Sequence, residues 1–141
     1  MNSKPSLEKI RAELAQLQRR EAVVYGSFCS GLTARSDIDV AVITRATSPA
    51  AQRRIWSYLL GTAPSRYDLK VFELLPLEVK MGVIRNYRVI FGNRLEVSEY
   101  FYHFRKLWED SAHRYYENQF SDFREKQRAL HRASSRESIT R

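Results

Sequence analysis

Apolar and polar positions alternate along the chain with two different spacings, one typical of helices and one typical of strands. Leucine and isoleucine recur every three or four residues over 6–20, which predicts an amphipathic helix. Helices are also predicted after Pro49 and Pro76, because proline is favoured in the first turn. Four short apolar runs predict strands at residues 22–26, 37–43, 67–75 and 87–93. The interleaved order predicts an α/β (α+β) domain.

A longer stripe of mostly aromatic residues follows at helical spacing. Its members are Val97, Phe101, Phe104, Trp108, Ala112, Tyr115 and Phe123, with Tyr116 and Phe120 beside them. A helix over 97–123 would be about 40 Å long, which exceeds the compact body expected of so small a domain. We therefore expect the distal half, 108–123, to expose aromatic rings that contact a second copy or a partner protein. The alternative is a helix that folds back and buries the whole stripe.

Composition and charge narrow the function classes. The 141 residues suit one domain, and the net charge of +8 should attract phosphate-bearing partners. A single cysteine, Cys29, allows no internal disulfide and favours a reducing cytoplasm. No apolar run approaches the roughly 18 residues of a membrane span. We expect a folded domain over 1–95, a helix over 96–125, and a disordered basic tail over 126–141.

Two acidic residues stand at the start of the second predicted strand. Asp37 and Asp39 are two residues apart and share a face, while Ile38, Val40 and Val42 on the other face can enter the core. Two carboxylates this close repel each other unless a positive group lies between them. Mg²⁺ prefers carboxylate oxygens and shares its remaining positions with substrate phosphates. The pattern therefore indicates a divalent metal site.

A glycine and a serine end the strand that precedes this acidic pair. Gly26 allows backbone N–H groups to approach a phosphate closely, and Ser27 follows it in the turn. The order strand, Gly-Ser turn, nine residues, and Asp-Ile-Asp on a second strand indicates a triphosphate and its metals in one cleft. The alternative is a surface turn followed by a strand with an acidic entry.

The stretch VVYGSFCSGLTARSDIDVAV resembles the signature of the DNA polymerase beta-like nucleotidyltransferases. Its length and layout are most similar to their minimal nucleotidyltransferases, which are often antitoxin-like partners of HEPN proteins. Gly26 and Ser27 match the phosphate-binding pair, Asp37 and Asp39 match the metal-binding carboxylates, and Gly31 matches a second common glycine. The resemblance covers roughly residues 7–93. It implies a small mixed sheet flanked by helices, with the long aromatic helix following.

Two family positions are less clear in this chain. Many relatives have a basic residue directly before the second glycine, where this chain has Ser30. The family also has a third carboxylate on a later strand, and the best match is Asp68 in YDLKVFE. Glu73 is the alternative, although its position along the strand places it with Leu69 and Val71 on the side that we expect to face the core.

The resemblance implies transfer of a nucleoside monophosphate. Asp37, Asp39 and Asp68 would hold Mg²⁺ (or Mn²⁺), and Gly26 with Ser27 would hold the phosphates of ATP or another nucleoside triphosphate. We favour AMP transfer to a hydroxyl, such as that of tyrosine, on a HEPN-type partner protein. The alternatives are a non-catalytic binding module that keeps the fold, and a basic nucleic-acid-binding protein.

Overall fold

The chain divides into two units in the computed structural model, which describes residues 4–29 and 37–139 and the side chains as far as residue 133. The first unit is Met1–Arg105, here called the sheet unit, and the second is Lys106–Arg141, here called the distal helix. Each is described separately below. No helix of the described residues is long and apolar enough to cross a membrane.

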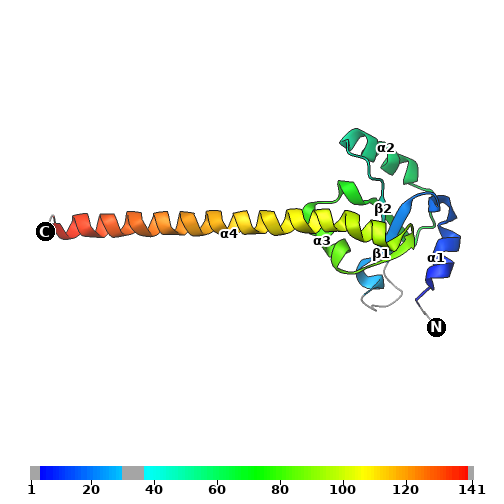
Figure 1. Cartoon of the computed structure of the whole chain (residues 1–141), viewed down its shortest axis with the longest axis horizontal. Coiled ribbons are helices and arrows are strands. Elements are labelled where there is room, and N and C mark those ends of the chain that lie inside the picture. The colour runs from blue at the N-terminus through cyan, green and yellow to red at the C-terminus, as the bar shows by residue number, and fades with distance from the viewer. Residues whose placement is uncertain (1–3, 30–36, 140–141) are drawn as a thin grey trace. The chain divides into compact units, whose positions relative to one another are not determined.

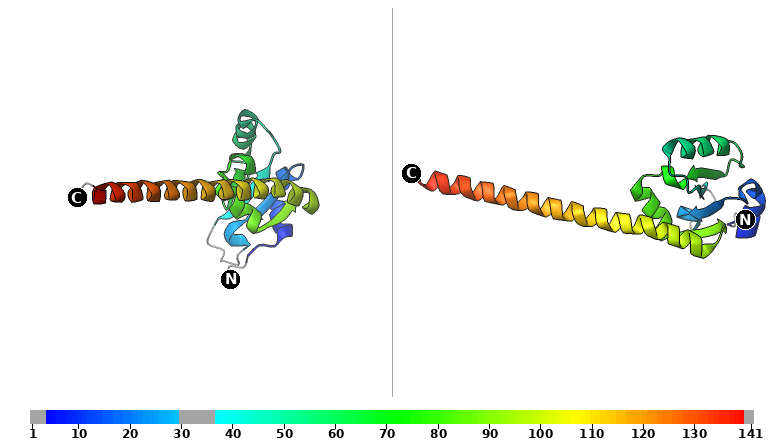
Figure 2. Two further views of the ribbon diagram at one scale, coloured as in Figure 1. Left: turned by 60° about the vertical axis from the view of Figure 1, so that its left-hand side comes forward. Right: turned by 45° about the horizontal axis from the view of Figure 1, so that its top comes forward.

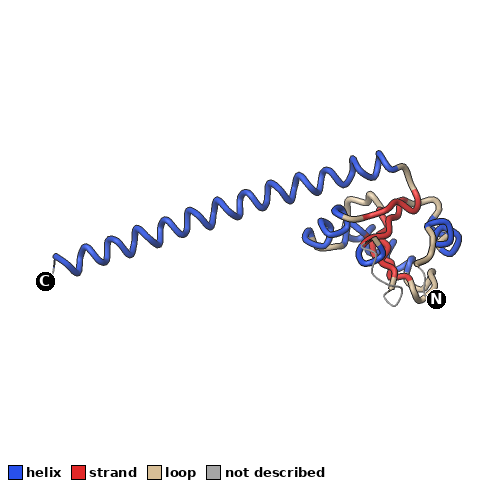
Figure 3. The backbone as a smooth tube through the Cα atoms, turned by 90° about the horizontal axis from the view of Figure 1, so that it is seen from below, coloured by secondary structure: helices blue, strands red, loops and turns tan. Residues whose placement is uncertain are grey.

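One four-stranded mixed sheet forms the centre of the sheet unit, in the order β3-β2-β1-β4 (Figure 3). Strand β1 (Glu21–Tyr25) pairs antiparallel with β2 (Ile38–Ile43) and with β4 (Tyr87–Phe91). Strand β3 (Tyr67–Val71) pairs parallel with β2 and is an edge strand. The mixed sheet with flanking helices confirms the predicted fold class.

The alternate residues of the central strands form the main core. Val24 on β1 and Val40 and Val42 on β2 are fully buried, together with residues from the helices that cover this face. Those helices are α1 (Leu7–Glu13) and α2 (Pro49–Leu59), and Figure 2 shows α2, in teal, at the margin of the sheet unit. The prediction that Ile38, Val40 and Val42 enter the core is therefore confirmed.

A second layer of apolar side chains comes from the later part of the sheet unit. Helix α3 (Leu77–Arg85) contributes the buried Met81, Val83 and Ile84. The first turns of α4 (Arg94–Ile139) contribute Val97 and Phe101, which are also buried. Phe101 packs its ring against Tyr87 of β4 at a centroid distance of 4.8 Å. This packing fixes the start of α4 on the sheet.

The helix starts follow local capping chemistry. Ser6 accepts a hydrogen bond from the Lys9 backbone N–H, and Ser48 accepts one from that of Ala51, directly before Pro49. Asn93 caps α4 through bonds from the backbone N–H groups of Leu95 and Glu96. The starts of α1, α2 and α3 agree with the sequence expectation.

Three expected boundaries differ from the structure. The helix expected over 6–20 ends at Glu13 and continues as a 3-10 turn over Ala15–Leu17, because Leu14 and Leu17 both turn into the core. The strand expected over 67–75 ends at Val71, and Phe72–Leu74 form a 3-10 turn that buries Phe72 completely. Asp37 lies just before β2 rather than on it.

The largest difference concerns the C-terminal segment. Helix α4 is continuous from Arg94 to Ile139, so it runs through residues 126–139, where we expected a disordered tail (Figure 1). The segment after Gly92 contains no glycine or proline, and residues 124–133 are mostly strong helix formers such as Arg, Lys, Glu, Gln, Ala and Leu. Local propensity therefore outweighs the polar, charged composition on which the expectation rested.

Candidate functional site

Gly26 links β1 to the turn that follows it. Its φ is +71°, a conformation that other residues rarely adopt. A methyl group added at Gly26 would lie 2.9 Å from Oδ2 of Asp39. The turn Gly26–Phe28 therefore packs directly against an acidic side chain, and a larger residue at position 26 would be strained by its positive φ and would displace the Asp39 carboxylate. Ser27, the other predicted phosphate-binding residue, is half-buried in the same turn.

Asp39 lies in the middle of an acidic group of residues on the sheet. It is opposite Tyr25 on β1 and opposite Asp68 on β3 in the strand pairing. Directly paired residues present their side chains on the same face of a sheet. The two predicted carboxylates Asp39 and Asp68 are thus neighbours, although 29 positions separate them in the sequence.

The charge of Asp39 is unfavourable in this position. Burial raises the pKa of its carboxyl above the ordinary value, and the negative charges of Asp68 and Asp37 raise it further. Lys70 opposes the rise in pKa only in part. Burial, Asp39 and Asp68 also raise the pKa of the Tyr25 phenol to about 12. The region around Asp39 is therefore short of positive charge.

Asp68 and Asp37 are more accessible than Asp39. The Asp68 side chain is 45% exposed, and the Lys70 ammonium lies 3.7 Å from its Oδ2. An ion pair this exposed contributes little to stability, so Asp68 can exchange Lys70 for another cation. Asp37 is exposed just before β2. Ser30 and Gly31 lie outside the described residues.

The donor set around Asp39 suits a divalent cation. Carboxylate oxygens are the ligands that Mg²⁺ prefers, and a cation there would relieve the repulsion that raises the pKa of Asp39. Among the residues that the structure describes, no three His, Cys, Asp or Glu side chains form a complete metal-binding group. Mg²⁺ commonly takes one or two carboxylates and completes its shell with water and substrate phosphates. The two paired carboxylates meet that requirement.

Glu73, the alternative to Asp68, has a different environment. Its carboxylate accepts hydrogen bonds from the Thr44 backbone N–H (3.0 Å) and hydroxyl (2.8 Å), from the Arg45 N–H (3.1 Å) and from the Tyr100 hydroxyl (2.7 Å). Both oxygens are therefore engaged in joining the end of β2 to the first turns of α4. The sequence shows no sign of this network, because its members are far apart along the chain.

A groove next to Asp68 also escaped the sequence analysis. It has a volume of about 440 Å³ and lies along the edge strand β3, beside α2. Apolar side chains, including Trp56 and Leu60, make up most of its lining. Arg53 and Lys70 add positive charge, and Asp68 itself belongs to the lining. The acidic site and an apolar groove are thus continuous.

Comparison with known proteins shows the family to which this chain belongs. A family model described as a nucleotidyltransferase domain matches residues 7–128. A protein of Methanocaldococcus jannaschii that bears the name putative protein adenylyltransferase is 45% identical over 105 residues. The match covers 74% of this chain and 81% of that protein.

Solved toxin–antitoxin structures have a similar fold. A chain in a MntA–HpeT mutant structure matches with a TM-score of 0.55 and 19% identity, over 75% of this chain and 89% of that chain. A toxin–antitoxin structure with AMP-PNP matches with a TM-score of 0.54 and 20% identity, over 71% and 87%. A complex of tri-AMPylated Shewanella oneidensis HEPN toxin with MNT antitoxin matches with a TM-score of 0.53 and 16% identity, over 74% and 88%. The chain therefore belongs to the nucleotidyltransferase domain family and has the fold found in MNT-type toxin–antitoxin structures.

Proposed function

We propose that this protein transfers AMP from ATP to a hydroxyl group of a partner protein, with Mg²⁺ (or Mn²⁺) bound between carboxylates of Asp37, Asp39 and Asp68. The observation that carries the proposal is the position of Asp39, crowded by Asp68 and by the Gly26 turn. Burial and the negative charge of Asp68 raise the pKa of Asp39, so a cation bound there would stabilise its carboxylate. The name of the 45% identical relative supports protein adenylylation as the reaction.

Each residue of the site has a distinct role in this proposal. The turn at Gly26 and Ser27 binds the β- and γ-phosphates through backbone N–H groups and the serine hydroxyl. Asp37 and Asp39 hold the cation, which when bound polarises the α-phosphate and neutralises the triphosphate. Positioning and charge neutralisation then provide most of the rate enhancement.

Asp68 acts on the acceptor side. The acceptor oxygen attacks the α-phosphorus, the bond from that phosphorus to the bridging oxygen breaks, and pyrophosphate leaves. The hydroxyl proton passes to the Asp68 carboxylate and then to water. The accessible position of Asp68, 45% exposed at the edge strand, allows an acceptor to reach it.

The acceptor belongs to a protein rather than a small molecule in this proposal. The groove that Asp68 shares with Trp56 and Leu60 is mostly apolar, and Arg53 and Lys70 favour an acidic or phosphorylated neighbour. An aromatic acceptor such as tyrosine fits this lining best. One structure with a chain of similar fold is a complex of a tri-AMPylated HEPN toxin with MNT antitoxin, which supports a HEPN-type partner and an antitoxin role.

A labelling experiment tests the function. The protein is incubated with Mg²⁺, ATP labelled on the α-phosphate, and the product of the adjacent reading frame. We expect label on that product, no label after chelation of the metal, and no label with Asp37→Asn combined with Asp39→Asn. Binding of Mg²⁺ and ATP without label on the partner would contradict the transfer reaction and favour a binding module.

A further inference from the structure

Among the described residues from 115 onward, the distal helix leaves five large apolar side chains exposed. Tyr116 and Leu130 are each 71% exposed, and Tyr115, Phe120 and Phe123 are exposed by about three fifths. At 100° per residue these five positions fall within an arc of about 140°, so they form one face of the helix. We call them the distal apolar face.

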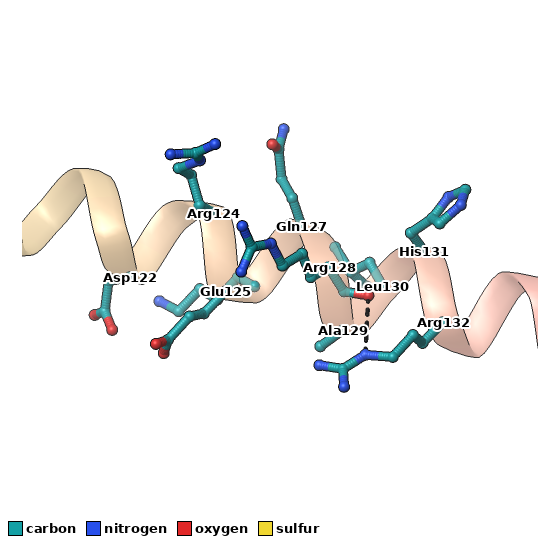
Figure 4. Close-up of a pocket in the computed structure, with 10 residues that line it drawn as sticks. Asp122, Arg124, Glu125, Gln127, Arg128, Ala129, Leu130, His131 and Arg132 are labelled. Atoms are coloured by element: carbon teal, nitrogen blue, oxygen red, sulfur yellow. Dashed lines mark hydrogen bonds between the residues drawn. The ribbon is translucent and has the colours of Figure 1, made fainter.

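The second unit consists of this one helix, so nothing within the unit covers the distal apolar face. Figure 4 shows the turns from Asp122 to Arg132, where all the side chains that line the surface come from α4 itself. A surface with one wall does not enclose a small ligand. A solitary helix is also marginal in water, since most helical stability in proteins comes from packing of an apolar face. An extended partner such as another helix would supply that packing.

The charges of the distal helix are divided between its two halves. Residues 106–122 contain four acidic and two basic side chains, for a net charge of −2. Residues 123–141 contain six basic and two acidic side chains, for a net charge of +4. A second copy in parallel would place like charges side by side. A second copy in antiparallel orientation would place each negative half against a positive half.

We propose that the distal helix pairs with the distal helix of a second copy in antiparallel orientation, with the two-fold axis near residues 122 and 123. Phe120 and Phe123 of both copies then meet at the centre, and Tyr115 lies opposite Leu130 of the second copy. An aromatic side chain has roughly 150–250 Å² to bury, and the eight rings of the two faces are exposed by about three fifths or more, so pairing could bury roughly 700–1,200 Å². That area is at the lower limit of a specific interface.

The proposal is independent of the proposed function, because it involves only the distal helix. An acidic partner protein would pair with the positively charged half of the distal helix and leave the negatively charged half without opposite charges. The second copy satisfies both halves with one interface, which is self-complementary as two-fold symmetry requires.

Light scattering tests the dimer. We expect a mass twice the 16.6 kDa of the chain. Phe120→Ala combined with Phe123→Ala should give a monomer that still binds Mg²⁺ and AMP-PNP through the sheet unit. The matched control, Ser111→Ala combined with Ser121→Ala, lies outside the distal apolar face and should stay dimeric. A monomeric unmutated protein, or equal loss of mass in both variants, would overturn the proposal.

Disulfide cross-linking tests the orientation. Ala112 and Ala133 lie opposite each other across the proposed axis, and both fall on the side of the helix that carries the distal apolar face. With Cys29→Ser to remove the native thiol, a mixture of Ala112→Cys and Ala133→Cys chains should form a cross-linked dimer. Each variant alone should not, because its two cysteines would be about 30 Å apart. Cross-links in either single preparation, or none in the mixture, would overturn the antiparallel arrangement.

Discussion

The sheet unit and the distal helix each contain an unfavourable feature. In the sheet unit two carboxylates lie side by side, and in the distal helix apolar side chains are exposed. The two features differ in what holds them in place. In the sheet unit, strand pairing holds the backbones of Asp39 and Asp68 side by side, so the two residues stay adjacent. In the distal helix, the side chains of Phe120 and Phe123 are mostly exposed, and the unit contains no other element that could cover them. The first arrangement indicates a site for a cation and the second a surface for another chain. A rigid framework can therefore support charge repulsion, whereas a solitary helix needs a partner to cover its apolar face.

The largest expected effect follows removal of the negative charge in the sheet unit. Asp37→Asn combined with Asp39→Asn should lower the affinity for Mg²⁺ with AMP-PNP by at least about 100-fold, because the cation loses two of the three proposed carboxylates. Calorimetry measures the affinity. The control pair in the distal helix, Glu109→Gln with Asp110→Asn, removes the same charge elsewhere and should leave binding unchanged. Equal weakening in both pairs would mean that only overall charge matters.

The next prediction separates Asp68 from Glu73. Asp68→Asn should reduce AMP transfer by about 100-fold or more, since a general base contributes on that order, and should change nucleotide affinity much less. Glu73→Gln should instead lower the free energy of unfolding by about 1–2 kcal/mol through its network with Thr44 and Tyr100, with transfer retained. Full transfer activity of the Asp68→Asn variant would show that Asp68 does not take part in the reaction.

Two glycines with similar backbone angles allow a matched test of the phosphate turn. Gly26 and Gly61 both have a positive φ, but only Gly26 lies against Asp39, and a methyl group at Gly61 would meet nothing within 4 Å. Both alanine variants should lose about 1–2 kcal/mol through backbone strain. Gly26→Ala should lose more than Gly61→Ala and should also weaken AMP-PNP binding. Chemical denaturation measures the stability, and identical losses would show that the contact with Asp39 is unimportant.

Binding of the metal and nucleotide should depend on pH through Asp39. The raised pKa means that Asp39 stays protonated to a higher pH than an ordinary aspartate. A cation binds the deprotonated carboxylate, so affinity should rise as pH increases through this pKa and level off above it. Calorimetry from about pH 4 to pH 7 covers the ordinary range of aspartate and the range above it. Affinity that falls with rising pH would contradict the assignment.

The smallest expected effect concerns the distal helix. If a second copy stabilises it, its helical content should fall on dilution, whereas the sheet unit should remain folded. Circular dichroism at 222 nm measures the change. Phe120→Ala with Phe123→Ala should remove the dependence on concentration. The unmutated protein would be diluted through the concentrations at which its measured mass halves. A helical signal that does not change over this range would mean that the helix is stable without its partner.

The sequence allowed much of the sheet unit to be predicted because its signals are local. Apolar runs identified all four strands, and Ser6, Ser48 and Pro76 stand at helix starts where capping chemistry places them. The strand pairing that brings Asp68 beside Asp39 depends on a parallel crossover, which periodicity does not determine. The family resemblance, rather than the pattern of residues, led to Asp68.

Other features depend on contacts that no short stretch of sequence contains. The four hydrogen bonds to the Glu73 carboxylate join segments that are distant along the chain. The groove between α2 and β3 is likewise lined by residues from distant segments. The extent of α4 was underestimated for the opposite reason. Its last turns are purely local structure, and the polar composition after Phe123 was given more weight than the absence of glycine and proline.

We expect the charge of Asp39 to be unfavourable when no cation is bound and to become favourable when a cation and nucleotide bind. The melting temperatures of the unmutated protein and of Asp39→Asn, with and without Mg²⁺ and AMP-PNP, test it most directly. Without ligands, Asp39→Asn should melt a few degrees higher, because it removes a desolvated charge beside Asp68. With ligands at about 100 times their dissociation constant, the unmutated protein should gain about 2.7 kcal/mol and become the more stable of the two. If Asp39→Asn melts lower without ligands, or if both proteins gain equally with them, the account is contradicted.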